Sequence, residues 1–140
     1  MALRARQDKA LGKVEVLDWR RFEDYDDVRK SENQPFTKPH GVYVLASPSV
    51  ILYVGTAIGK TGFYGRYNAR GILDAALEGT QKKLFFAHVE PSQADEIERR
   101  LIQDEVESGN RRILRHNRVR LIPNENIELK HIGDVPPFKH

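Results

Sequence analysis

Two short apolar runs near the middle of the chain, residues 41–46 and 50–55, give the clearest secondary-structure pattern in the sequence. Valine, isoleucine, leucine and tyrosine dominate both runs, and a Ser-Pro-Ser turn at 47–49 separates them. Such runs, bounded by turn residues, are typical of a β-hairpin. With the turn centred on its proline, we expect Tyr43 to lie directly opposite Tyr53 on one face, with the Cβ atoms ~5 Å apart.

The apolar character of both runs is nearly continuous rather than alternating. Strands covered on both faces have this pattern, so we expect helices on at least one side of the hairpin and other chain on the second. Gly41 and Gly55 flank the hairpin. A bulge, or the close approach of a phosphate, would need a missing Cβ at such positions.

Three further segments have the patterns of regular structure. Residues 63–77 tolerate a helix that places Arg66 and Arg70 on the rim of its buried side. Residues 83–89 are apolar enough to form a central strand, and residues 127–132 are a candidate edge strand. The fold class that we predict is α+β, with a small three-stranded antiparallel sheet flanked by helices.

A second helix opens at Pro91 and has an apolar stripe made of Ala94, Ile97, Leu101, Ile102 and Val106. Glu98 projects close to the middle of this stripe, where a carboxylate is costly unless a cation or hydrogen-bond donors receive it. A helix glutamate in such a place is more often paired with an arginine than with a metal, and Arg99 and Arg66 are candidate partners. Glu105 lies near the same line but close to the helix end, where water or an arginine could satisfy it.

The remaining segments are harder to interpret. Residues 1–40 form an N-terminal arm with one apolar strip, which we expect to pack Trp19 and Phe22 onto a main domain at residues 41–140 as a short strand or helix. A substrate-specificity or dimerisation element is the alternative, and composition does not separate it from packing. The tail around residues 136–138 is expected to be loose.

Composition is that of a single soluble globular domain. Of 140 residues, 39% are hydrophobic and 31% are charged, which allows a core without disulfides. The chain has no cysteine, which excludes thiolate zinc sites and is compatible with a reducing cytosol, so we expect a cytoplasmic protein. No secretory signal and no run long enough to span a bilayer is visible, so no membrane partner is expected.

The formal net charge of +3 is mildly basic, but its distribution is more informative. A short stretch without any acid contains Arg111, Arg112, Arg115, Arg118 and Arg120. This stretch is a candidate phosphate-contacting patch, and a solvated helix face is an equally good interpretation. The five histidines show no paired metal-ligand spacing, so we do not expect a zinc site.

Five short motifs then follow one another in a fixed order: Gly41-Val42-Tyr43, Tyr53-Val54-Gly55, Phe63-Tyr64-Gly65-Arg66, Ile97-Glu98 followed by Leu101-Ile102, and His116-Asn117. This ordered set resembles the GIY-YIG nuclease superfamily over most of the chain. The positions that match the family's functional residues are Tyr43, Tyr53, Arg66, Glu98 and Asn117.

The resemblance implies a metal-dependent phosphodiesterase. Glu98 would hold a single Mg²⁺ or Mn²⁺ on the scissile phosphate, a role that suits a lone carboxylate with waters and phosphate oxygens. Tyr43 would act as general base or position the attacking water, and Arg66 would bind the non-bridging oxygens as charge builds. Tyr53 would orient water or phosphate, and Asn117 would fix a contact at the sheet edge. Taken alone, a strand tyrosine is more often core packing than catalytic.

The chain also departs from the family pattern. Arg70 stands where many members have histidine or tyrosine, so this position could bind phosphate but could not act as a base. Tyr67 is a substitute hydroxyl close to Arg66, and Thr56 stands where some members have lysine. The proline that often precedes the asparagine is absent. With the basic stretch, the expected nucleic-acid-binding set is Arg70, Tyr67, Arg111, Arg112, Arg115 and Arg118.

From the sequence we therefore expect a metal-dependent endonuclease, with DNA favoured over RNA as substrate. The alternatives are a catalytically inactive nucleic-acid-binding module and a toxin-like RNase. No second DNA-reading domain is visible, so a long specific target is not expected unless the protein forms a homodimer or works with a partner protein.

Overall fold

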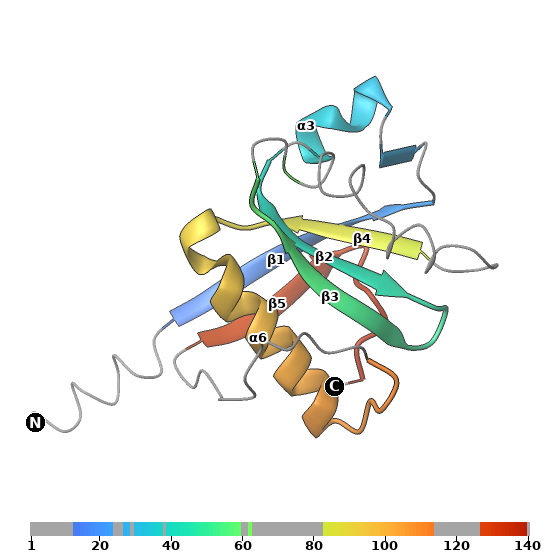
Figure 1. The fold of residues 1–140 in the computed structure, drawn as a ribbon, viewed down its shortest axis with the longest axis vertical. Coiled ribbons are helices and arrows are strands. Elements are labelled where there is room, and N and C mark those ends of the chain that lie inside the picture. The colour runs from blue at the N-terminus through green and yellow to red at the C-terminus, as the bar shows by residue number, and fades with distance from the viewer. Residues whose placement is uncertain are drawn as a thin grey trace, which may run out of the picture.

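A five-stranded mixed sheet with strand order β3-β2-β4-β1-β5 forms the centre of the structure, a computed structural model (Figure 1). The structure describes residues 13–23, 27–28, 30–37, 39–59, 62, 83–113 and 127–139. The elements in chain order are β1 Lys13–Phe22, η1 Ser31–Asn33, α3 Gln34–Thr37, β2 Gly41–Ala46, β3 Ile51–Ala57, β4 Lys83–His88, α6 Pro91–Glu107 and β5 Ile127–Gly133.

The predicted fold class, a three-stranded antiparallel sheet flanked by helices, is wrong. The three expected strands are present as β2, β3 and β4, and they pair antiparallel. The sheet then continues through β1, antiparallel to β4, and through β5, parallel to β1. The candidate edge strand near residue 127 is confirmed as β5, whereas the residues of β1 were expected in an arm.

Strand β1 was hard to recognise because its apolar residues change face in the middle. Val14 and Val16 lie on an exposed side, while Leu17 and Trp19 are buried on the other. The run therefore shows neither clean alternation nor a helical period. The expected packing of Trp19 and Phe22 is confirmed, since both side chains are buried.

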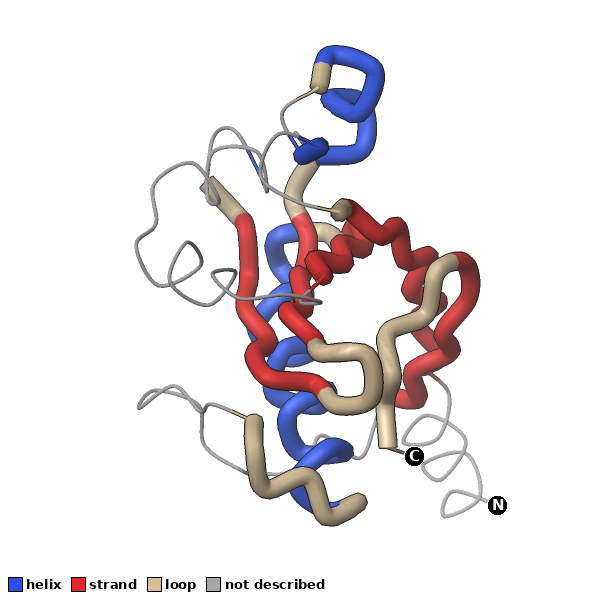
Figure 2. The backbone as a smooth tube through the Cα atoms, turned by 90° about the vertical axis from the view of Figure 1, so that its right-hand side faces the viewer, coloured by secondary structure: helices blue, strands red, loops and turns tan. Residues whose placement is uncertain are grey.

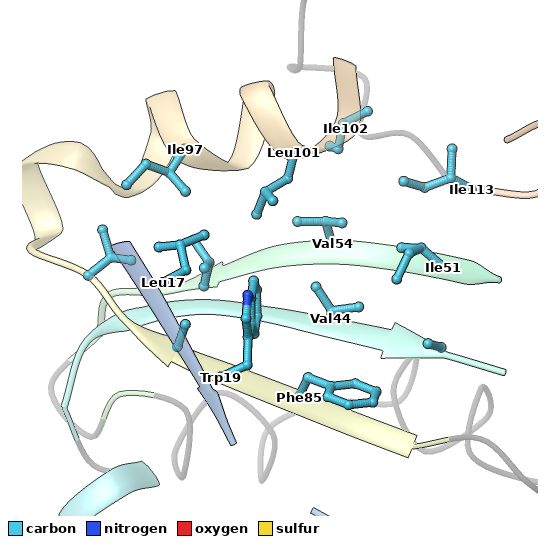
Figure 3. Close-up of a cluster of buried hydrophobic side chains, with 14 residues drawn as sticks. Leu17, Trp19, Val44, Ile51, Val54, Phe85, Ile97, Leu101, Ile102 and Ile113 are labelled. Carbon is cyan, nitrogen blue, oxygen red and sulfur yellow. The ribbon is translucent and has the colours of Figure 1, made fainter. Parts of the chain in front are cut away.

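Helix α6 covers the β2–β3 side of the sheet with the stripe that the sequence indicated. Ile97, Leu101 and Ile102 are fully buried and point at the strands in Figure 3. Beneath them lie Val44 and Val54 of the hairpin (Figure 3). Figure 2 shows the long helix running alongside the strands. Each such aliphatic side chain contributes about 1.5–3 kcal/mol when removed from water, so this layer holds α6 over the hairpin.

The opposite face of the sheet has its own apolar cluster, made of Phe22, Val28, Tyr43, Leu45, Tyr53, Ala57, Leu84 and Phe86. Every residue of β2 is buried, because its side chains enter the two clusters in turn. The expectation that the hairpin is covered on both faces is confirmed.

A buried polar network fixes the end of α6. The Asn110 Nδ2 donates to the Ile51 carbonyl at 2.9 Å and to Glu105 Oε1 at 2.9 Å. Its Oδ1 accepts the backbone N–H groups of Arg112 and Ile113 at 2.9 and 3.2 Å. One side chain thus joins the helix, strand β3 and the segment that follows the helix.

The C-terminal segment is ordered against the core rather than loose, contrary to the expectation for the tail. The backbone N–H of Lys139 donates to Glu105 Oε2 at 2.8 Å. The Phe138 ring lies 4.4 Å from the His131 ring and 5.8 Å from the Trp19 ring, measured between centroids. The Trp19 indole donates to His131 Nδ1 at 2.9 Å, so this nitrogen carries no proton.

Within the described residues, no helix is both long and apolar enough to cross a membrane.

We expect Asn110→Ala to lower the free energy of unfolding by about 2–4 kcal/mol, because it removes the donors and acceptor of a buried network. Asn110→Asp should lower the free energy of unfolding further at neutral pH, since it places a second carboxylate beside Glu105. The carboxyl introduced by the substitution would have a raised pKa in the folded state beside the buried Glu105, so the deficit should shrink as the pH falls. Urea unfolding at two pH values measures both effects.

The control is Ser108→Ala at an exposed neighbouring position, which should change stability by less than about 0.5 kcal/mol. An Asn110→Ala variant as stable as the wild type would show that the network does not hold the helix end.

Candidate functional site

The hairpin of β2 and β3 brings the two tyrosines together, but not as direct partners. Tyr43 is paired with Gly55, and Tyr53 with Leu45, because the register shifts next to Ala46. The prediction that Tyr43 lies directly opposite Tyr53 is therefore wrong, because the strands pair in a different register. The rings are still neighbours, with centroids 5.9 Å apart and an angle of 32° between their planes.

The position of the turn and a bulge together explain the error, by one residue each. Leu45 pairs with Tyr53 while Ala46 pairs with Ile51, so β3 carries one extra residue at that point. The turn itself is closed by the backbone N–H of Ser47, which donates to the Val50 carbonyl at 3.0 Å. The Ala46–Ile51 pair already places the turn centre between Pro48 and Ser49, so without the extra residue Tyr43 would face Val54, and composition reveals neither shift.

Both glycines of the hairpin are required by close packing within the protein. A Cβ on Gly55 would lie 2.5 Å from Cζ and Oη of Tyr43, so the tyrosine ring lies across this residue. A Cβ on Gly41 would clash with the carbonyl oxygen of Ala87. The space that the sequence suggested for a phosphate is thus filled by neighbouring chain at both positions.

The tyrosine pair is enclosed. Tyr43 is 0% exposed and Tyr53 is 6% exposed, and they share the apolar cluster with Leu45, Leu84 and Phe86. This packing fixes the ring positions tightly.

Glu98 lies on the buried face of α6, as the helical pattern predicted, and is 1% exposed. The helix packs against β2 and β3 through the face of the sheet that carries Val44 and Val54. Tyr43 and Tyr53 occupy the other face of the same two strands. Helix α6 and the tyrosine pair therefore lie on different faces of the sheet, although both belong to the same hairpin-and-helix unit.

The other predicted site residues are only partly described. Arg111 and Arg112 follow α6 and are exposed, as a phosphate-contacting patch requires. The predicted residues Arg66, Tyr67, Arg70, Arg115, Asn117 and Arg118 lie outside the described residues.

A second set of polar and aromatic side chains, on the tyrosine side of the sheet, was missed by the sequence prediction. Asp18 and Arg20 of β1, Phe36 of α3 and His88 of β4 line one cavity there. Alternation along β1 would have placed Asp18 and Arg20 on one face, but only after β1 had been recognised as a strand.

A larger cavity of about 560 Å³ lies at the opposite face, between the hairpin turn and the C-terminal segment. Its two cations, Arg21 and Lys83, both bind Glu23, at 3.1 and 2.7 Å. The hydrogen bond from Lys83 lowers the pKa of Glu23. Because one acid engages both cations, this cavity offers little free positive charge.

The donor set limits the kind of metal that the described residues could hold. Residues 13–59, 83–113 and 127–139, as far as they are described, contain no cluster of three or more histidine, aspartate or glutamate side chains placed close enough to hold a metal ion together. A lone Glu98 fits a hard cation bound by one protein carboxylate, with water and phosphate as its other ligands. It does not fit a cation that takes most of its ligands from protein side chains.

In comparisons with known proteins, the chain matches no family model, no curated protein and no solved structure.

We expect Gly55→Ala to lower the free energy of unfolding by about 1–3 kcal/mol, because the new methyl group must displace the Tyr43 ring from a packed cluster. Urea unfolding midpoints measure the loss, and tyrosine absorbance reports the displaced ring.

Gly59→Ala is the matched control, since a Cβ there meets nothing within 4 Å. Its stability should equal or slightly exceed that of the wild type. Equal stability of the two alanine variants would contradict the packing of Tyr43 on Gly55.

Proposed function

We propose that the chain is a metal-dependent phosphodiesterase that acts as an endonuclease, with DNA as the favoured substrate. The observation that carries the proposal is a buried carboxylate, Glu98, on the helix that packs against the hairpin bearing Tyr43 and Tyr53. The motif order supports it further, because the resemblance to GIY-YIG nucleases rests on these residues among others.

In this proposal the residues of the chain have separate tasks. Glu98 would hold Mg²⁺ or Mn²⁺, and an ion bound there would stabilise charge on the leaving 3′ oxygen. Tyr43 and Tyr53 would orient the attacking water, and Arg66 and Asn117 would bind the phosphate and its surroundings. The exposed Arg111 and Arg112 would add attraction to the nucleic-acid backbone.

The geometry sets one requirement on this mechanism. Helix α6, which carries Glu98, and the tyrosines lie on opposite faces of the sheet, and β3 is an edge strand among the described strands. Groups from the two faces of a sheet can meet without crossing it only around an edge. The proposal therefore requires the phosphate to be held at the outer edge of β3.

A second candidate function is a nucleic-acid-binding module without cleavage. It is favoured by the complete burial of Tyr43, because a general base must reach water or substrate. A toxin-like RNase differs from both in its substrate. Cleavage assays on several nucleic acids separate the three.

We expect Glu98→Gln to reduce metal-dependent strand scission by about 100-fold or more, because it removes the only charge proposed to hold the ion while keeping the side-chain volume. The measurement is cleavage of supercoiled DNA, single-stranded DNA and RNA, each with Mg²⁺, Mn²⁺ or EDTA. Glu96→Gln, at an exposed position of the same helix, is the matched control and should cleave like the wild type.

Glu98→Ala is included to test the fold. If it unfolds the protein, Glu98 acts as a structural ion-pair partner. Nucleic acid that is retarded but uncut under every condition would leave the binding module as the function, and the catalytic roles would be withdrawn.

A further inference from the structure

We infer that the smaller cavity, on the tyrosine side of the sheet, binds one unpaired base of a single-stranded nucleic acid. The inference rests on the nucleic-acid binding that the proposed function includes, and it narrows the substrate class to single-stranded or locally unpaired strands. It does not depend on cleavage.

The cavity has the size and lining of a small-ligand site. Its volume is about 420 Å³, within the range of ligand pockets, and it is bounded by β1, β4 and the segment around α3. Phe86 lies within it, while Pro35, Phe36 and Pro39 contribute apolar surface from the η1–α3 side. Figure 1 shows α3 standing apart from the helix α6, at another side of the sheet.

The main recognition feature is a stack of an arginine on an aromatic ring. The Arg20 guanidinium carbon lies 3.6 Å from the centre of the Phe36 ring, and both side chains are exposed. Unpaired bases stack on aromatic rings and on guanidinium planes, and arginine also attracts the phosphate that accompanies the base. Among the described residues, no carboxylate forms a salt bridge with Arg20, so its charge is available.

Polar groups beside this stack can bind a base edge. Asp18 contributes a carboxylate that accepts hydrogen bonds from base amino groups. His88 lines the same cavity, and its Nδ1 lies 2.7 Å from the His40 carbonyl oxygen, which can only accept. Its Nδ1 therefore carries the proton, which leaves Nε2 as an acceptor in the neutral ring.

The cavity selects for unpaired bases because of its shape. A paired base is stacked between its neighbours in a duplex and exposes only its edges in the grooves. A half-open cavity lined by strands on one side and two prolines on the other accepts a base only after that base has left the stack.

The sheet register connects this cavity to the tyrosines. Arg20 pairs with Phe86, Phe86 with Tyr43, and Tyr43 with Gly55, so the four residues form one row across four strands on one face. Neighbouring strands are about 5 Å apart, so the Arg20 and Tyr43 backbones lie about 10 Å apart. A base in the cavity would thus lie on the same face of the sheet as Tyr43, which is itself buried.

The test is fluorescence anisotropy of a labelled 12-nucleotide single strand and of a hairpin duplex, both in EDTA so that cleavage cannot interfere. We expect Arg20→Ala and Phe36→Leu each to weaken single-strand binding about 10-fold, as loss of a base stack does, and to change duplex binding less than twofold. Phe36→Tyr keeps an aromatic face and should bind like the wild type.

The matched control is Arg21→Ala, which removes the same charge from the next residue on the opposite face of β1. Arg21→Ala should weaken binding to the single strand and to the duplex only slightly and to the same extent. Urea unfolding of every variant ensures that the comparison is made between folded proteins.

The inference is overturned if Phe36→Leu binds single strands like the wild type, or if Arg20→Ala and Arg21→Ala weaken single-strand binding by the same factor. A wild-type protein that binds neither form of nucleic acid also overturns it. Failure of the cleavage assay with intact single-strand selectivity would instead reject the nuclease and leave this site in place.

Discussion

The buried pair of Glu105 and Asn110 is the constraint on which the arrangement of the molecule depends. Glu105 is fully buried and receives the Asn110 side chain and the Lys139 backbone N–H, one on each carboxylate oxygen. Asn110 in turn holds the Ile51 carbonyl of β3. Hydrogen bonds to a charged group contribute about 1.5–3 kcal/mol, and losing one here would leave a buried carboxylate with one donor fewer. The helix end, the edge strand and the C-terminal segment are therefore fixed together.

This constraint bears directly on the candidate site, because Glu98 is on the same helix. Two helical turns separate Glu98 from Glu105, and both acids lie on the buried side of α6. The apolar residues between them hold the helix on the sheet, but apolar contacts permit small rotations. The polar network has directional bonds to β3, so it fixes how far along the strand Glu98 stands. The structural acid thus positions the candidate functional one.

The sequence predicted the elements whose signals are local. The hairpin, the third strand and the stripe of α6 were recognised from residues close together in the chain, and so was the burial of Glu98. The parts of the fold that the sequence did not predict depend on pairing between residues far apart in the chain. The first and last strands, β1 and β5, lie side by side in parallel, so no turn signal joins them.

Two further misses have specific physical causes. The turn is centred between Pro48 and Ser49, and β3 carries one extra residue; together these two shifts change the partner of Tyr43 from Tyr53 to Gly55, and nothing in the composition marks either. The burial of Tyr43 and Glu98 was predicted, but burial alone does not say on which face of a sheet a side chain lies. The sequence prediction placed both residues inward, and the structure adds that helix α6 and the tyrosines lie on different faces of the sheet.

The two faces of the sheet consequently offer different access to a nucleic acid. The α6 face is filled by aliphatic side chains over most of the hairpin, so a strand cannot enter between helix and sheet without breaking the core. The opposite face is also closed over the hairpin, where Tyr43 and Phe86 are buried, and its row of paired residues opens only at Arg20 of β1, which is exposed. An unpaired base could therefore reach this face only at the cavity beside Arg20. Cleavage that uses Glu98 would need the outer edge of β3 instead, so binding and cleavage would use separate places on the sheet.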